Sequence, residues 1–114
     1  MASPLFNRGR LQEVSSGDEA FEKELVDLFE LEMNANFTKL KIAFEESNQK
    51  DAILHSHDMK GLAANIGAPR CKEIAEKMEI LCKDKKLEES SKLLPSLQET
   101  FEETMEVINK EYSK

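Results

Sequence analysis

Residues 51–68 read DAILHSHDMKGLAANIGA, and they carry the clearest structural pattern in the chain. Small and apolar residues recur here at intervals of three and four positions, which is the spacing of one face of an α-helix. They are Ala52, Ser56, Met59, Ala63 and Ile66. Gly67 is placed to end this helix, and Pro69 suits the first turn of a following one. The stretch therefore predicts two helices joined by a tight turn.

The preceding segment predicts two further helices. A short one is expected over about residues 6–14, and a longer one follows the capping signal at 16–18. The inner face of the longer helix begins with three apolar residues, Phe21, Leu25 and Leu28. From Met33 onward the apolar positions are displaced by one, which predicts a bend or break at 34–36. A loop is expected at 48–50.

The segment after Pro69 predicts a helix that ends in the lysine-rich stretch 83–86, where cations suit a helix C-terminus. Its inner face carries Cys71, Ile74, Met78 and Leu81. A last helix is expected over about 88–111. Its inner residues are Leu94, Leu97, Phe101, Met105 and Ile108. Pro95 falls inside this helix and predicts a kink or a helix in two parts.

No segment alternates in the manner of a strand, and the 114 residues include only four Gly and three Pro. The predicted fold class is therefore all-α, an up-and-down antiparallel four-helix bundle with a short N-terminal covering helix. We expect a single domain over residues 1–114, with an N-terminal arm at 1–17 and the bundle at 18–111.

The formal charge of −7 is unevenly distributed: residues 13–32 sum to −7 and 87–111 to −5, but 50–86 sum to +2. An acidic chain without a basic stripe is a poor nucleic-acid binder, because phosphate contacts need lysine and arginine. No apolar run is long enough for a membrane span or a secretory signal, which favours the cytoplasm, and the nucleus as well in a eukaryote. Cys71 and Cys82 lie too far apart along one helix for a disulfide.

The outer face of the helix over 51–66 does not look like a solvated face. It carries Leu54, His57, Gly61, Ala64 and Ala68. A glycine inside a helix costs about 1 kcal/mol relative to alanine. We therefore expect Gly61 to give a partner or a phosphoryl group access to His57, with Lys60 beside any bound anion. The simpler interpretation is a surface histidine on a face that packs against the N-terminal helix.

A turn centred near residue 68 would place residue 57 opposite Glu79 of the next helix. The Glu79 carboxylate would then fix the imidazole tautomer and leave the other ring nitrogen as a nucleophile. Lys83, one turn further, would join Lys60 beside an anion. An ion pair between Glu79 and Lys83 alone is an equally good interpretation. A metal site at His55 and His57 is not favoured, because these residues diverge by about 200° around the helix.

Residues 57–68, HDMKGLAANIGA, resemble the signature of histidine-containing phosphotransfer domains. The shared pattern is a histidine, two residues, Lys-Gly, a stretch of small residues, and Gly-Ala ten positions after the histidine. The segments 21–29 and 78–79 also look like this family. Two residues depart from the pattern: Leu62 stands where relatives often have Ser, Ala or Gly, and Pro69 replaces a more usual polar residue.

The resemblance implies a role for four residues. The phosphorylated histidine falls on His57, the adjacent lysine on Lys60, the permissive glycine on Gly61, and the hydrogen-bonding residue of the next helix on Glu79. Such domains take a phosphoryl group from the aspartate of one response-regulator receiver domain and pass it to the aspartate of another. Some receive it directly from a histidine kinase.

We therefore expect a monomeric phosphorelay intermediate of two-component signal transduction, with receiver domains and a hybrid histidine kinase as partners. It would need no cofactor or metal and have no kinase or ATP site of its own, and Mg²⁺ would sit on the receiver. Docking is expected on exposed small and apolar residues. They are Leu54, Ala64, Ala68, Phe6, Leu11 and Val14. The alternatives are a non-catalytic helical adapter for receiver-like partners and a fragment of a hybrid sensor kinase.

Overall fold

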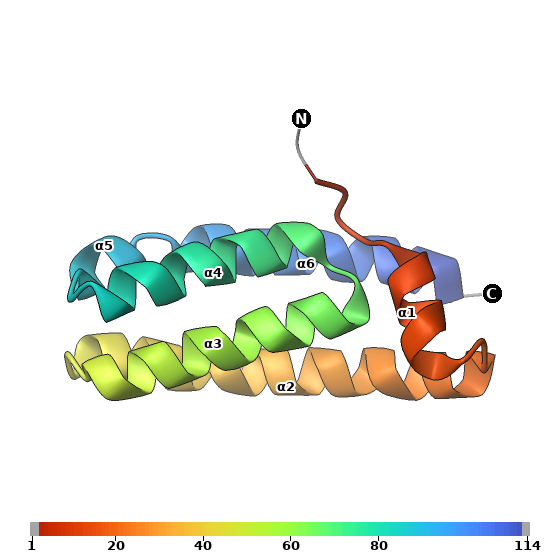
Figure 1. Ribbon diagram of the computed structural model, residues 1–114, viewed down its shortest axis with the longest axis horizontal. Helices are drawn as coiled ribbons and strands as arrows, with labels where there is room; N and C mark the ends of the chain where they lie inside the picture. The colour runs from red at the N-terminus through yellow and green to blue at the C-terminus, as the bar shows by residue number, and fades with distance from the viewer. Residues whose placement is uncertain (1–2, 113–114) are drawn as a thin grey trace.

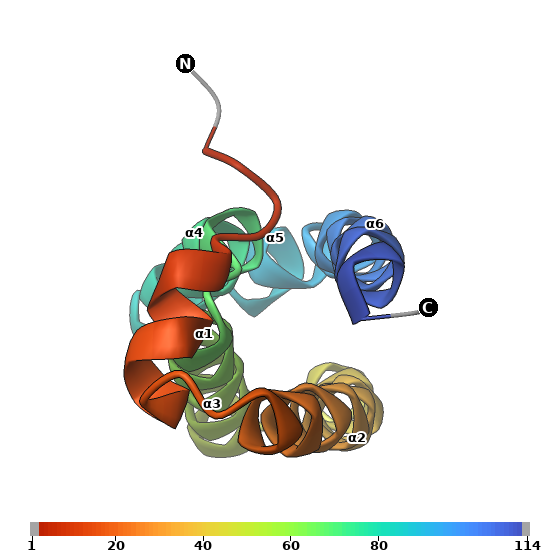
Figure 2. The same cartoon turned by 90° about the vertical axis from the view of Figure 1, so that its right-hand side faces the viewer.

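The structure, a computed structural model, describes residues 3–112, which form six helices. They are α1 (Arg8–Ser15), α2 (Glu19–Glu45), α3 (Gln49–Ile66), α4 (Pro69–Lys83), α5 (Leu87–Ser91) and α6 (Leu94–Tyr112). Helices α2, α3, α4 and α6 run in alternating directions as a bundle, and α1 crosses one end of it (Figures 1 and 2). The expected all-α class is confirmed. None of these helices combines the length and the apolar character that a membrane span requires.

Helix α2 is continuous over 27 residues, so the predicted bend or break at 34–36 is wrong. One buried stripe runs along the whole helix without a change of register. It consists of Glu22, Val26, Phe29, Met33, Phe37, Leu40 and Ala43. Phe21 and Leu28, which we had expected inside, are exposed because they belong to a neighbouring face. The bend was predicted because residues from two neighbouring faces of the helix were treated as one inner face.

The turns at both ends of α3 follow from local capping. Asn48 accepts a hydrogen bond from the backbone N–H of Asp51 at 3.0 Å and so caps the N-terminus of α3. The predicted loop at 48–50 is therefore shorter, because the helix already begins at Gln49. Gly67 ends α3 with a φ of 86°, a left-handed conformation that suits glycine. Pro69 is the first residue of α4, as predicted.

The chain after α4 forms two helices, α5 and α6, as Pro95 predicted. The proline is the second residue of α6, where its missing N–H needs no partner inside the helix. The side chain of Phe101 on α6 packs against Phe29 and Phe37 of α2, with ring centroids 5.7 and 5.5 Å apart. These contacts close the bundle on the side away from α3.

Helix α1 is fastened to the bundle through Arg8. Its guanidinium lies 3.4 Å from the carboxylate of Glu22 on α2 and 3.5 Å from that of Glu111 on α6. It also lies 4.9 Å from the centroid of the Tyr112 ring, within the range of a cation–π interaction. Leu11 anchors the same helix in the core. Arg8 therefore joins the first and last helices at one end of the bundle.

Candidate functional site

His57 stands on the outer face of α3, and its side chain is 60% exposed. Its Nδ1 lies 3.0 Å from Oε2 of Glu79 on α4, which confirms the predicted pairing across the α3–α4 turn. An ionised carboxylate only accepts hydrogen bonds, so the neutral imidazole carries its proton on Nδ1. The lone pair of the second nitrogen, Nε2, is then left available to a partner. The contact orients the ring and assigns different roles to the two nitrogens.

Glu79 is the centre of the site, because three side chains bind its buried carboxylate, which is only 4% exposed. Lys60 Nζ lies 2.7 Å from Oε1, and Lys83 Nζ lies 3.1 Å from Oε2. Burial opposes ionisation of Glu79, but the hydrogen bonds from Lys60, Lys83 and His57 outweigh it and lower the pKa from 4.5 to about 2. Glu79 therefore pairs both with His57 and with Lys83, which the sequence analysis treated as alternatives.

The two lysines place positive charge beside the exposed histidine. The hydrogen bond to Glu79 raises the pKa of Lys60 above its ordinary value, so its ammonium group is charged at neutral pH. Lys83 reaches the same carboxylate from one turn further along α4. An oriented nitrogen nucleophile with ammonium groups nearby can accept and stabilise a transferred anionic group.

Gly61 lies one turn after His57, and nothing lies within 4 Å of the position that its β-carbon would occupy. Packing therefore does not require a glycine there. The residue borders a shallow hollow of about 300 Å³ beside His57. The hollow is lined by Glu32, Asn36, His57, Asp58, Gly61, Leu62 and Asn65. The missing side chain leaves the approach to the histidine open, as we expected from the cost of a glycine inside a helix.

A second hollow, which we call the apolar groove, lies between α1, α2 and α3 and has a volume of about 250 Å³. It is lined by Leu11, Val14, Leu25, Leu28, Phe29, Glu32, Leu62, Asn65 and Ile66. Glu32, Leu62 and Asn65 line both hollows, so the groove continues into the hollow beside His57. The sequence analysis missed this surface. Its signal was the series 21, 25, 28, 32 and 36, a second face of α2 at helical spacing.

The predicted docking residues are only partly accessible. Leu54 and Val14 are exposed, and Ala64 and Phe6 are half-buried. The prediction is wrong for Leu11 and Ala68, which are both 0% exposed. Leu11 is the inward residue of α1. Ala68 is covered because the N-terminal arm crosses the α3–α4 turn, where the N–H of Asn7 donates to the carbonyl of Gly67 at 2.6 Å.

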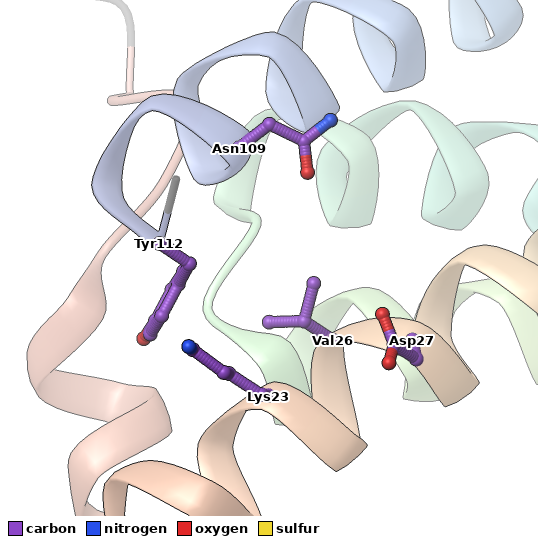
Figure 3. Close-up of a pocket in the computed structure, with 5 residues that line it drawn as sticks. All are labelled: Lys23, Val26, Asp27, Asn109 and Tyr112. Carbon is purple, nitrogen blue, oxygen red and sulfur yellow. The ribbon is translucent and has the colours of Figure 1, made fainter. Parts of the chain in front are cut away.

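A hollow of about 350 Å³ lies between α2 and α6 (Figure 3), and His57 is not among the residues that line it. The side chains of Lys23, Val26 and Asp27 line it from α2, and those of Asn109 and Tyr112 from α6. No histidine, cysteine or serine lines it, and the hydroxyl group of Tyr112 has no hydrogen-bond partner among the described residues. Among residues 3–112, no group of three or more His, Cys, Asp and Glu side chains is placed to hold a metal ion.

Comparisons with known proteins identify the family of this chain. Residues 24–107 match the family model of the Hpt domain. The chain is 31% identical over 104 residues to the phosphorelay intermediate protein rdeA of Dictyostelium discoideum, and the match covers 91% of this chain. It spans only 41% of the length of that relative.

A likeness of fold extends to bacteria. The crystal structure of histidine-containing phosphotransfer protein B (HptB) from Pseudomonas aeruginosa PAO1 superposes with a TM-score of 0.88 over 96% of both chains, at 18% sequence identity. That structure and this one share the helical bundle. Since the family model matches most of the chain and includes the oriented histidine of α3, this chain belongs to the family of Hpt domains, the histidine-containing phosphotransfer domains.

Proposed function

We propose that Nε2 of His57 accepts a phosphoryl group from the aspartate of one receiver domain and passes it to the aspartate of another. The observation that carries the proposal is the 3.0 Å contact between Nδ1 and Glu79 on a side chain that is 60% exposed. A histidine without a function on an exposed helix face has no need of a buried carboxylate to orient it. The protein would thus act as an intermediate in two-component signalling.

In the proposed step, the lone pair of Nε2 forms a bond to phosphorus as the bond from phosphorus to the aspartyl oxygen breaks. The aspartate leaves as a carboxylate, and Nδ1 keeps its proton, so the ring carries a positive charge that Glu79 stabilises. Lys60 and Lys83 balance the charge of the transferred group. The return step is the reverse reaction, with the aspartate of the second receiver as the nucleophile. Mg²⁺ would be supplied by the receiver domain.

The proposed partners are receiver domains, one of them on a hybrid histidine kinase. They would dock on the exposed residues around His57, with Leu54 on one side and the apolar groove on the other. We also propose that the protein acts as a monomer in a reducing compartment such as the cytoplasm. Cys71 and Cys82 are buried free thiols, which fits this proposal, but their separation along α4 would keep them unpaired in any compartment.

The test is transfer from a receiver domain that carries a phosphoryl group on its aspartate, in the presence of Mg²⁺. We expect label on the protein that is labile to acid and stable to base. The His57→Gln variant should acquire no label. His55→Gln is the matched control, since His55 lies on the same helix but is half-buried and away from Glu79, and it should accept label at the rate of the parent.

Two results would overturn the proposal. Equal labelling of the parent and of His57→Gln would place the phosphoryl group elsewhere. Binding of receiver domains without any labelling of the parent would instead identify a non-catalytic adapter. Receivers from the source organism should be used for this test, because docking selects among them.

A further inference from the structure

The apolar groove has an acidic border. Glu32 lines both the groove and the hollow beside His57, and Asp58 lines that hollow from α3. Glu24 lies one turn before the exposed Leu28 and therefore on the same face of α2. Within residues 3–112, none of these three carboxylates forms an ion pair. We call Glu24, Glu32 and Asp58 the acidic rim.

The site is therefore polarised across His57. On the α4 side, Lys60 and Lys83 surround the Glu79 carboxylate. On the α2 side, the acidic rim and the apolar groove begin at the hollow that His57 lines. A partner that reaches His57 covers both sides at once, because Glu32, Leu62 and Asn65 connect groove and hollow. Its surface must be complementary to both.

We propose that the apolar groove receives an apolar protrusion of a receiver domain that is flanked by lysine and arginine side chains, which pair with the acidic rim. This inference rests on the proposed function, because it concerns the partner of the same histidine. Long-range attraction between opposite charges raises the association rate by 10-fold to 1,000-fold. The rim would thus select basic-flanked receivers and orient them, with their acidic phosphorylation site over Lys60 and Lys83.

The dimensions and charges of the surface favour this occupant. A groove of about 250 Å³ has room for one or two large apolar side chains, not for a whole helix. An acidic partner would meet three carboxylates that lack counter-ions. A second copy of this chain, with its net charge of −7, would bring further acid to the same face.

The experiment compares two triple variants with equal changes in charge. The rim variant is Glu24→Lys, Glu32→Lys and Asp58→Lys. The control variant is Glu99→Lys, Glu102→Lys and Glu106→Lys, which alters exposed residues of α6. Each receiver domain that labels the parent protein is used as the probe. Two quantities are measured at about five NaCl concentrations between roughly 25 and 400 mM: the affinity for the unphosphorylated receiver and the rate of phosphoryl transfer.

We expect the rim variant to lose at least 10-fold in affinity and in kcat/KM at low salt. Added salt should lower the kcat/KM of the parent and reduce the difference between the two proteins. The control variant should stay within twofold of the parent. Circular dichroism verifies that all three proteins are equally helical.

Equal losses in the rim and control variants, no loss in either, or tighter binding by the rim variant would each overturn the basic-flanked partner. Phosphoryl transfer by the parent would still stand in those cases. Absence of label on the parent with every receiver overturns the proposed function itself, so the two failures are distinguishable.

Discussion

At the scale of single residues, Glu79 does two things with one carboxylate. A buried charge is tolerated only when it is paired and hydrogen-bonded. Glu79 is 4% exposed and meets both conditions through His57, Lys60 and Lys83. The same contacts that make its burial tolerable hold the imidazole and both lysines in place. Changes at this residue should therefore affect both the stability of the fold and the orientation of the site.

The depressed pKa of Glu79 makes its contribution to stability depend on pH. The folded-state pKa of about 2 lies below the ordinary 4.5, so the contribution is fully present above about pH 4.5 and is lost as the pH falls towards 2. We expect Glu79→Gln to lower the free energy of unfolding by about 1–3 kcal/mol at pH 7. Urea unfolding at several pH values should show this difference shrinking below pH 4.5. The exposed Glu102→Gln is the control, and a constant difference for Glu79→Gln would contradict the prediction.

Substitutions at Gly61 can distinguish its effect on the stability of α3 from its effect on access to His57. Its β-carbon position is open, so Gly61→Ala should raise the free energy of unfolding by about 0.5–1 kcal/mol through helix propensity. Gly61→Gln should keep the helix but obstruct the approach to His57 and slow phosphoryl transfer by about tenfold, a barrier increase of roughly 1.4 kcal/mol. Thermal unfolding and transfer kinetics on the same samples measure both effects. Unchanged kinetics in Gly61→Gln would remove the access argument.

The sequence predicted Glu79 opposite His57, because antiparallel helices have the same rise per residue and the turn between them was visible at Gly67. It left an ion pair of Glu79 with Lys83 alone as an equally good interpretation. It did not show how one carboxylate is shared. Glu79 binds three donors because each carboxylate oxygen accepts more than one hydrogen bond. Periodicity assigns residues to a face but cannot count the donors that reach it from the next helix.

At the scale of elements, the α3–α4 turn sets the register of the site. Gly67 adopts a φ of 86°, and its carbonyl accepts the N–H of Asn7. A β-carbon at residue 67 would lie in hard contact with the Asn7 carbonyl oxygen. The turn is therefore fixed both by its own backbone conformation and by the N-terminal arm that crosses it.

Gly67→Ala should consequently lower the free energy of unfolding by more than its backbone strain alone would. A left-handed residue other than glycine costs roughly 1–2 kcal/mol, and the contact with Asn7 adds to it, so we expect a total of about 2–4 kcal/mol. Gly17→Ala is the matched control, because Gly17 has a φ of 79° and open space around its β-carbon position. Urea denaturation of both variants tests the difference. Equal destabilisation would show that the contact with the arm contributes nothing.

The helix boundaries were mostly predictable, but the path of α2 was not. Its two apolar faces lie side by side: one packs into the bundle through Val26 and Phe29, and the other faces α1 through Leu25 and Leu28. The spacing of apolar residues shows that both faces of α2 are apolar, but it does not show which face packs into the bundle and which one faces α1. The same limit explains Leu11 and Ala68, since distant parts of the chain bury them: the bundle covers Leu11 of α1, and the N-terminal arm crosses the turn at Ala68.

At the scale of the whole molecule, Arg8 connects α1 to α2 and α6, and α1 forms one wall of the apolar groove. Glu22, its partner on α2, is only 2% exposed, and one of its carboxylate oxygens has no hydrogen-bond partner among the described residues. Without Arg8 this buried carboxylate would lose its counter-ion. The position of α1, and with it the shape of the groove, depends on this contact.

Arg8→Ala should destabilise the protein more than the loss of an exposed ion pair would, because the buried Glu22 carboxylate loses its counter-ion, and it should speed hydrogen exchange in α1. Adding Glu22→Gln should recover part of the loss, because a neutral amide is cheaper to bury than an unpaired charge. Arg10→Ala is the control: its ion pair with Glu13 is exposed and should be worth at most about 0.5 kcal/mol. Chemical denaturation and exchange mass spectrometry measure the effects. A loss in the double variant equal to the sum of the single losses would contradict the coupling.

The three contacts of the Glu79 carboxylate, with His57, Lys60 and Lys83, also affect how firmly His57 would hold a phosphoryl group. Two ammonium groups against one carboxylate leave a single excess positive charge next to the imidazole, whereas a phosphoryl group brings nearly two negative charges. The proton on Nδ1 of the phosphorylated ring would supply a second positive charge, and this ring would leave as a neutral imidazole when the phosphoryl group departs. A carrier with such a site does not become a trap: the feature that prepares the histidine to receive the group also leaves the group ready to depart.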